Sequence, residues 1–196
     1  MAGTTVWTYF ATCLTKTSDT FVANAGLFGK VYFPRLAVPV SILISNLIAF
    51  TIQFVFFLAF MAYFALRGSH LHPRPYILLT PILLLMMAGL GLGFGLIVSA
   101  LTTKYRDLRF LVQFGVQLLM YATPVVYSIS SIPARFRPLI MANPMTSVIE
   151  TFRYAFLGGG TVSLGGLAYS FTFMVVIVAI GAVIFNRVEA TFVDTL

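Results

Sequence analysis

Charged side chains are scarce in this sequence. Five acidic and twelve basic residues make up 9% of the 196-residue chain, and 60% of the chain is hydrophobic. Soluble domains carry roughly 25% charged residues, so this chain has too few to cover a surface that faces water. The apolar segments are about twice the length of a barrel strand and do not alternate with polar residues, unlike those of a β-barrel. We therefore predict an all-α, polytopic transmembrane helical bundle that forms a single transmembrane domain over residues 1–196.

Residues for metal binding and acid/base catalysis are also lacking. Cys13 is the single cysteine, so neither an intrachain disulfide framework nor a cysteine zinc cluster is possible. Asp107 and Glu150 fall in connectors on opposite sides of any alternating topology, so they do not form an acid/base pair. His70 and His72 have no further metal ligand nearby in sequence, and a solvated turn is the better interpretation. We expect no catalytic residue and no metal site.

Two further signals are missing. A phosphate-binding loop would read G-x-x-x-x-G-K-S/T, but residues 24–31, the nearest approach, have Asn in place of the first Gly and Val after the Lys. The basic residues are scattered through the connectors and do not form the blocks that nucleic-acid binding requires. We expect this chain to bind no cofactor and no nucleic acid, and to hydrolyse no nucleotide.

Five segments are predicted to cross the membrane. A crossing needs about 20 residues, and the first segment reaches that length only if the helix continues past Lys16. Between the last two segments, residues 133–142 and 144–157 are predicted as two short helices, because Asn143-Pro144 supplies a helix cap and a first-turn proline. The predicted spans are residues 4–23, 37–66, 75–101, 110–129 and 166–185.

Glycine is concentrated in the third predicted span, at Gly89, Gly91, Gly93 and Gly95. The pairs 89/93 and 91/95 match the small-x-x-x-small pattern that lets helix backbones approach closely. A hinge is the alternative interpretation, and tight packing is the one we favour.

Polar residues recur on single helix faces within the predicted spans. Gln113, Gln117 and Tyr121 are each four residues apart, and Asn46 and Gln53 are seven apart. An amide in hydrocarbon is costly unless it meets another helix or a water-filled cavity. These five residues are candidates for a translocation path, and the alternative is that they only tie helices together.

The short helices before the last span suggest a gate. Glu150 and Arg153 are three residues apart and can pair on one helix face. With Asn143 and Pro144 they form the candidate gate residues. A pair of interfacial helices lying flat on the membrane is the alternative. The distribution of basic residues does not decide the orientation, because six on one side face five on the other.

The connector over residues 24–35 carries an apolar edge outside the spans. Leu27 and Val31, and also Phe28 and Tyr32, are four residues apart. Such an edge needs a partner, either the lipid headgroup layer or a groove on a soluble protein. From the residues alone, membrane lipids are the favoured partner.

Several motifs resemble one family in order along the chain. They are N-x-x-L-F-G-K-V-Y-F-P-R-L-x-x-P at 24–39, K-Y-R-D-L at 104–108, T-P-V-V-Y at 123–127, N-P-M at 143–145, F-N-R-V-E at 185–189 and F-V-D at 192–194. Together they resemble the polysaccharide-export permeases of ABC transporters, of the type-2 exporter permease family. Those members begin with an amphipathic helix and a further span, so this chain looks shortened at its start.

The resemblance implies a homodimer in the inner (plasma) membrane, bound to two nucleotide-binding ATPase subunits that carry ATP and Mg. It makes residues 24–35 a cytoplasmic coupling helix and residues 133–157 gate helices on the outer side. The carboxy-terminus and Lys104 then lie in the cytoplasm, and Arg67 and Arg135 lie outside. The implied ATPase contacts are Leu27, Phe28, Lys30, Val31, Tyr32, Phe33 and Arg35.

The expected function is export of a lipid-linked polysaccharide of the O-antigen, capsule or teichoic-acid type. A permease of the same family for another amphiphile, such as a drug or lipo-oligosaccharide, is the first alternative. A membrane enzyme acting on lipid-linked sugars is the second, and it would need paired carboxylates at one membrane face.

Overall fold

The computed structural model describes residues 1–24, 36–68, 74–105 and 107–193, and all regular structure within these ranges is helical. The predicted all-α class is therefore confirmed for the described part of the chain. The elements are α1 (Ala2–Ser18), α2 (Thr20–Ala23), α4 (Ala37–Leu66), the 3-10 helix η1 (Pro75–Leu79), α5 (Thr80–Lys104), α6 (Leu108–Ala122), the 3-10 helix η2 (Ile129–Ser131), α7 (Arg137–Met141), α8 (Pro144–Leu157) and α9 (Leu164–Val193).

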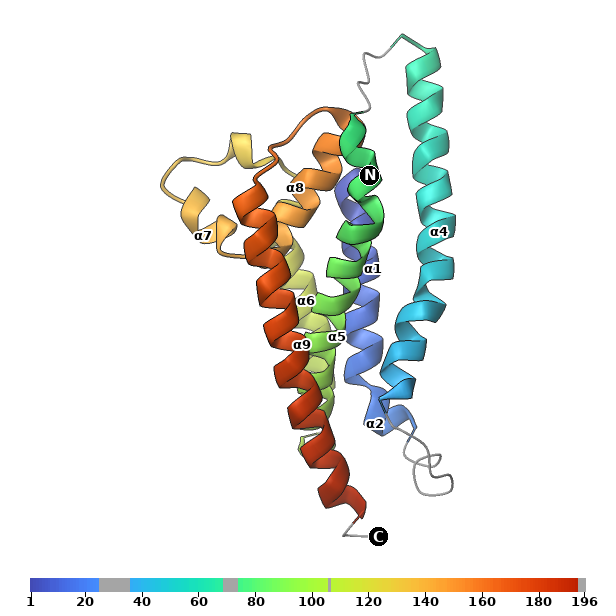
Figure 1. The fold of residues 1–196 in the computed structure, drawn as a ribbon, viewed down its shortest axis with the longest axis vertical. Coiled ribbons are helices and arrows are strands. Elements are labelled where there is room, and N and C mark those ends of the chain that lie inside the picture. Colours follow the sequence, from blue (N-terminus) through green and yellow to red (C-terminus); the bar gives the residue numbers. More distant parts are fainter. Residues whose placement is uncertain (25–35, 69–73, 106, 194–196) are drawn as a thin grey trace.

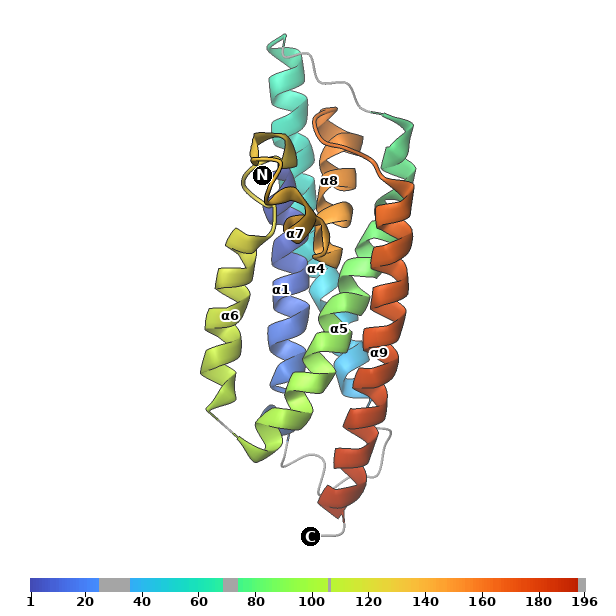
Figure 2. The same ribbon diagram turned by 90° about the vertical axis from the view of Figure 1, so that its left-hand side faces the viewer.

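The helices α1, α4, α5, α6 and α9 run along the long axis of the molecule (Figures 1 and 2). α1 and α5 are central, α9 packs on α5, and α4 and α6 lie on different sides of α1. We call the end that holds Met1, η1, α7 and α8 the α7 end. The opposite end, which holds α2 and the last turns of α9, is the C-terminal end.

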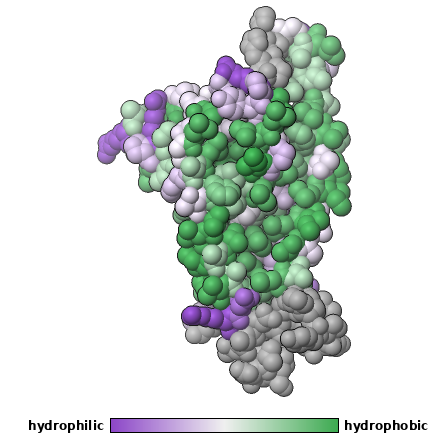
Figure 3. Space-filling view, viewed as in Figure 1, coloured by the Kyte–Doolittle hydropathy of each residue, from purple (hydrophilic) through white to green (hydrophobic). Residues whose placement is uncertain are grey.

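Three of the described helical stretches are long and apolar enough to cross a membrane: Ala37–Leu66, Pro75–Thr103 and Leu164–Val188. α6 is a shorter apolar helix, and α1 has 17 residues. On the face shown in Figure 3, the surface between the two ends is predominantly hydrophobic, as a bilayer requires. These helices indicate a multi-pass membrane protein. The predicted number of about five spans is not confirmed, because length and composition identify three among the described helices.

The glycines of α5 bring three helices into close contact. A Cβ atom built at Gly93 would lie 2.6 Å from Cγ2 of Ile177 on α9, and one at Gly91 would lie 2.9 Å from Cβ of Cys13 on α1. Gly89 meets Met174 and Gly95 meets Thr17 in the same alternation. The four glycines thus face α9 and α1 in turn. This arrangement agrees with the interpretation that they allow tight helix packing.

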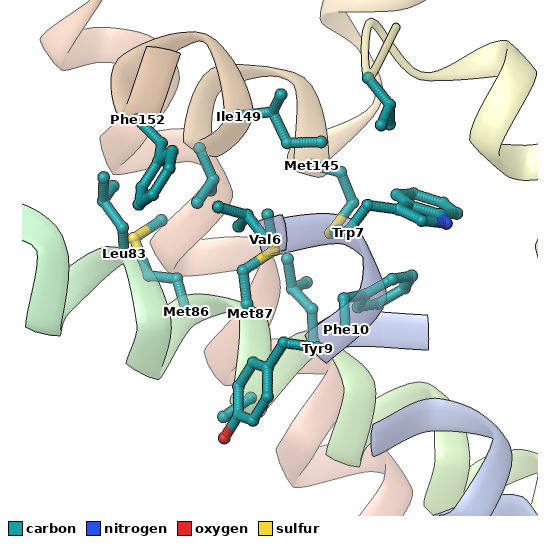
Figure 4. Packing of buried hydrophobic residues seen from close by; sticks show 14 of the residues in the cluster. Val6, Trp7, Tyr9, Phe10, Leu83, Met86, Met87, Met145, Ile149 and Phe152 are labelled. Atoms are coloured by element: carbon teal, nitrogen blue, oxygen red, sulfur yellow. The ribbon is translucent and has the colours of Figure 1, made fainter. Parts of the chain in front are cut away.

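The largest buried cluster lies where α8 crosses α1 and α5 (Figure 4). Phe10, Met87, Ile149 and Phe152 are at most 1% exposed, and they come from three different helices. In contrast, only 17% of the most apolar window of α4, and of α9, is buried. α8 is therefore a core element although it is too short to span, and the outer faces of α4 and α9 are left for lipid.

Two predicted spans end earlier than the sequence suggested. The predicted helix over 4–23 is interrupted at Asp19, which separates α1 from α2. α6 ends at Ala122 instead of residue 129, because Thr123 precedes a proline and adopts an extended conformation (φ −110°, ψ 142°).

The remaining boundaries are mixed. The helix over 144–157 is confirmed at both ends, with Gly158 in the left-handed conformation after it. The predicted helix over 133–142 is helical only from Arg137 to Met141, and α9 continues from Leu164 to Val193 instead of ending at residue 185. Asn186 and Arg187 are therefore part of the helix and do not close it.

Candidate functional site

Arg153 on α8 binds the segment that follows α6. Its Nη1 donates to the carbonyl of Tyr127 at 2.9 Å, and its Nη2 donates to the carbonyls of Pro124 (2.8 Å) and Val125 (2.9 Å). Carbonyl groups beyond the end of a helix lack intrahelical partners. The planar guanidinium satisfies three of them and also bonds Glu150, whereas a lysine ammonium has only three N–H donors on one atom.

Glu150 completes this arrangement one turn earlier on α8. Its Oε1 lies 2.7 Å from Nη1 of Arg153, and its Oε2 accepts a hydrogen bond from the backbone N–H of Thr161 at 3.3 Å. Glu150 is 1% exposed. The ion pair predicted from the spacing is confirmed. It joins two connectors, 124–127 and 158–163, that are far apart in sequence.

The same corner depends on Gly160. Its φ of +126° lies in a region that favours glycine, and a Cβ there would lie 2.9 Å from the carbonyl oxygen of Glu150. In the sequence, residues 158–160 indicate only a helix stop.

Asn143 fixes the start of α8. Its Oδ1 accepts from the backbone N–H of Met145 at 3.0 Å, and its Nδ2 donates to Oγ1 of Thr123 at 2.8 Å. The hydroxyl of Ser170 on α9 donates to the carbonyl of Pro144 at 2.6 Å. The predicted helix cap is confirmed, and it also ties α8 to the end of α6 and to α9. Thr123 and Ser170 gave no signal in the sequence, because their partners are 20 and 26 residues away.

An apolar groove of about 650 Å³ opens beside this cap, between α6, α7 and the buried faces of α1 and α5. Three polar side chains line the groove: Tyr121, Tyr127 and Asn143. The last two already form hydrogen bonds within the protein. Asn143 makes the bonds described above, and the hydroxyl of Tyr127 donates to the carbonyl of Tyr121 at 2.9 Å. The groove is lined by Phe10, Phe94, Leu119, Tyr121, Ala122, Tyr127, Phe136, Leu139, Ile140, Asn143, Pro144 and Met145.

The five candidate path residues do not share one surface of the single chain. Gln113, Gln117 and Tyr121 are exposed along α6, and Tyr121 is 74% exposed. Asn46 and Gln53 lie on α4, on another side of α1.

Asn46 is 3% exposed, and its Oδ1 accepts a hydrogen bond from Nζ of Lys16 on α1 at 2.8 Å. Its amide nitrogen lies 3.9 Å from the sulfur of Cys13. For this residue the geometry favours the helix-tying interpretation. Gln53 is half-buried about two turns further along α4.

A long-range ion pair at the C-terminal end was not predicted. Nε of Arg109, at the start of α6, lies 3.2 Å from Oδ2 of Asp19, at the break between α1 and α2. The side chain of Arg109 is 48% exposed. Ninety residues separate the partners, so no local spacing could have indicated the contact.

Two groups of predicted residues lie outside the described part of the chain. The candidate ATPase contacts Leu27, Phe28, Lys30, Val31, Tyr32, Phe33 and Arg35 fall within 25–35, and His70 and His72 fall within 69–73. Among the described residues, no group of three or more His, Cys, Asp or Glu side chains is placed to hold a metal ion.

Comparison with known proteins defines the class. The profile of the ABC-2 type transporter family matches residues 1–157, and the chain belongs to this family. The predicted resemblance to polysaccharide-export permeases is confirmed at this level.

Three relatives carry the name "O-antigen export system permease protein RfbA". One from Klebsiella pneumoniae is 27% identical over 190 residues, which cover 97% of this chain and 71% of the relative. A second from the same organism is 26% identical over the same shares. A third, from Myxococcus xanthus, is 29% identical over 76% of this chain and 56% of the relative.

Proposed function

We propose that this chain is the membrane permease subunit of an ATP-driven exporter of a lipid-linked polysaccharide of the O-antigen type. The observation that carries the proposal is the family match over residues 1–157, together with relatives named as O-antigen export permeases that align with 97% of the chain. Membership in the ABC-2 family implies an ATPase partner. In this proposal the partner binds ATP and Mg, and the chain itself transports without catalysing a reaction.

We propose further that two copies assemble with their α6 helices facing each other. Gln113 and Gln117 are exposed on α6, which is an apolar helix. An exposed amide in hydrocarbon is costly, so these side chains need a polar partner. The same residues on α6 of the second copy, together with water between the two helices, supply this partner. Tyr121 continues the polar face of α6 toward the groove. This supports α6 as the path-lining helix, with α4 tied to α1 behind it.

The cap at the α7 end serves as the gate in this proposal. Arg153 and Glu150 bind the connectors on both sides of α8, so the end of α6, α8 and the start of α9 move as one unit. In this proposal, force from the ATPase enters through the 24–35 connector, and the helices α2 and α4 that flank it in sequence carry the force toward the cap. Transport of another amphiphile is the second candidate, because the groove is apolar.

The proposed orientation makes a direct prediction about labelling. We expect cysteines at residues 67 and 135, both at the α7 end, to react with an impermeant thiol reagent on intact cells. A cysteine at residue 104, at the C-terminal end, should react only after the membrane is opened. The background is Cys13→Ala, since Cys13 is buried and the sole thiol. Labelling at 104 without labelling at 135 would reverse the orientation.

The coupling role is tested at Phe28, which this proposal assigns to the ATPase contact. Phe28→Asp puts an unpaired charge into a desolvated interface, which costs several kcal/mol. We expect co-purification with the ATPase to weaken about a hundredfold or more, since about 1.4 kcal/mol is a factor of ten. Surface O-antigen should be lost in parallel.

Phe28→Leu is the matched control because it keeps an apolar side chain. It should retain both assembly and export, and both variants should insert into the membrane. Full assembly and export with Phe28→Asp would show that the connector rests on lipid headgroups instead. Export of a different amphiphile by the intact pair would favour the second candidate function.

A further inference from the structure

The α7 end carries most of the net charge of the molecule. Residues 67–75 and 123–163 contain five arginines and one glutamate, which leaves +4 of the chain's formal +7. Glu150 and Arg153 neutralise each other in the buried pair. The positive-inside rule does not account for this excess, because the α7 end faces outward in the proposed orientation. The exposed cations at this end are Arg67, Arg74, Arg135 and Arg137.

Two of these arginines are sequence neighbours of a residue that lines the apolar groove, and we call this position the rim. Arg135 and Arg137 flank Phe136, whose side chain is part of the groove lining. The guanidinium of Arg137 is held in place by the carbonyls of Ile132 (3.1 Å) and Ser130 (3.4 Å), and that of Arg135 lies 5.6 Å from the Phe136 ring centroid.

These two guanidiniums have donors left for an anion. Arg137 uses two of its five N–H groups in the bonds to backbone. Within the described ranges, neither Arg135 nor Arg137 has a carboxylate within 4.0 Å. Arginine forks match the oxygen geometry of phosphate, so the rim is suited to a phosphate group.

The groove below the rim suits hydrocarbon better than sugar. A sugar carries many hydroxyls that need hydrogen-bond partners. Of the three polar side chains in the lining, Asn143 and Tyr127 already bond within the protein, which leaves the hydroxyl of Tyr121. Most of the remaining lining is aromatic and aliphatic, from Phe10 and Phe94 up to Leu139. A volume of about 650 Å³ lies within the range of small-molecule sites.

We propose that this groove is a binding site for an anionic phospholipid of the surrounding bilayer. One acyl chain lies in the groove between α6 and α7, and the phosphate is held by Arg135 and Arg137. Charge complementarity and the apolar lining both select this occupant. The site goes beyond glycan export and does not depend on it.

The test is native mass spectrometry of the purified full chain in detergent micelles. The titrants are phosphatidylglycerol and phosphatidylcholine with identical acyl chains. We expect saturable binding of phosphatidylglycerol at least tenfold tighter than that of phosphatidylcholine. Arg135→Gln/Arg137→Gln should reduce this preference about tenfold or more, because each arginine near a phosphate surface contributes about a factor of five.

The matched control is Arg67→Gln/Arg74→Gln, which removes the same charge at the same end away from the groove. It should leave the preference unchanged. Arg135→Gln alone guards against a folding effect, since Arg135 makes a ring contact while Arg137 also holds the backbone of residues 130–132. It should weaken phosphatidylglycerol binding and leave thermal unfolding unaltered.

Three results would overturn the proposal. Equal binding of the two lipids would remove the phosphate specificity. An equal loss in the Arg67/Arg74 control would reduce the effect to general surface charge. Displacement of phosphatidylglycerol by millimolar inorganic phosphate would show a phosphate site without a chain-binding groove.

Discussion

Arg153→Met should lower the thermal unfolding midpoint of the purified protein far more than the substitution of an exposed arginine. The change leaves the carboxylate of Glu150 buried and unpaired, and it strips the carbonyls of Pro124, Val125 and Tyr127 of their donor. Breaking a buried pair costs about 3–5 kcal/mol. For a chain of this length that corresponds to a fall in Tm of about 6–20 °C.

Arg109→Met is the matched control. It breaks a longer ion pair, 3.2 Å to Asp19 against 2.7 Å for Arg153 and Glu150, and the Arg109 side chain is 48% exposed. Surface pairs contribute about 0–1 kcal/mol, so its Tm should fall by no more than about 4 °C. Arg153→Lys should lie between the two, because an ammonium keeps the charge without the fork of donors. Equal Tm values for the two methionine variants would show that the cap does not depend on the buried pair.

Gly93→Ala should destabilise the contact between α5 and α9. The added Cβ would lie 2.6 Å from Cγ2 of Ile177 and 2.9 Å from the backbone of Ile177 and Val178. Backbone atoms cannot rotate away, so the two helices must separate. Overpacking of this kind costs about 1–3 kcal/mol, and thermal unfolding should show a fall in Tm of about 2–12 °C.

Gly115→Ala on α6 provides the comparison. A Cβ at Gly115 meets nothing within 4 Å, and alanine is favoured over glycine in a helix by about 1 kcal/mol. Its Tm should therefore stay the same or rise slightly. If Gly93 instead behaved as a hinge, Gly93→Ala would keep or raise the Tm while export declined.

Local sequence patterns predicted the elements whose cause is local. The cap at Asn143-Pro144 and the stop at Gly158 depend on the conformations of neighbouring residues, and α8 has both boundaries as predicted. The pairing of Glu150 with Arg153 follows from helix geometry alone. The predicted end of α6 was wrong, because the proline at Thr123-Pro124 ends the helix seven residues before residue 129.

The polar residues show the limit of this reasoning. Asn46 and Gln117 have similar amide side chains in similar apolar surroundings, and both were predicted to line a path. Asn46 meets Lys16 at a helix contact, whereas Gln117 is exposed on α6. Periodicity identifies a helix face, but it does not say what that face meets.

The sequence by itself determined the membrane class, the helical fold and the family, because scarcity of charge, long apolar segments and ordered motifs are properties of the chain. Only the tertiary structure decided that Arg153 binds the carbonyls after α6, that the α5 glycines alternate between α1 and α9, and that an apolar groove opens beside Phe136. These features join residues from separate helices. They depend on how the helices pack, because side chains far apart in sequence come into contact only after the chain has folded.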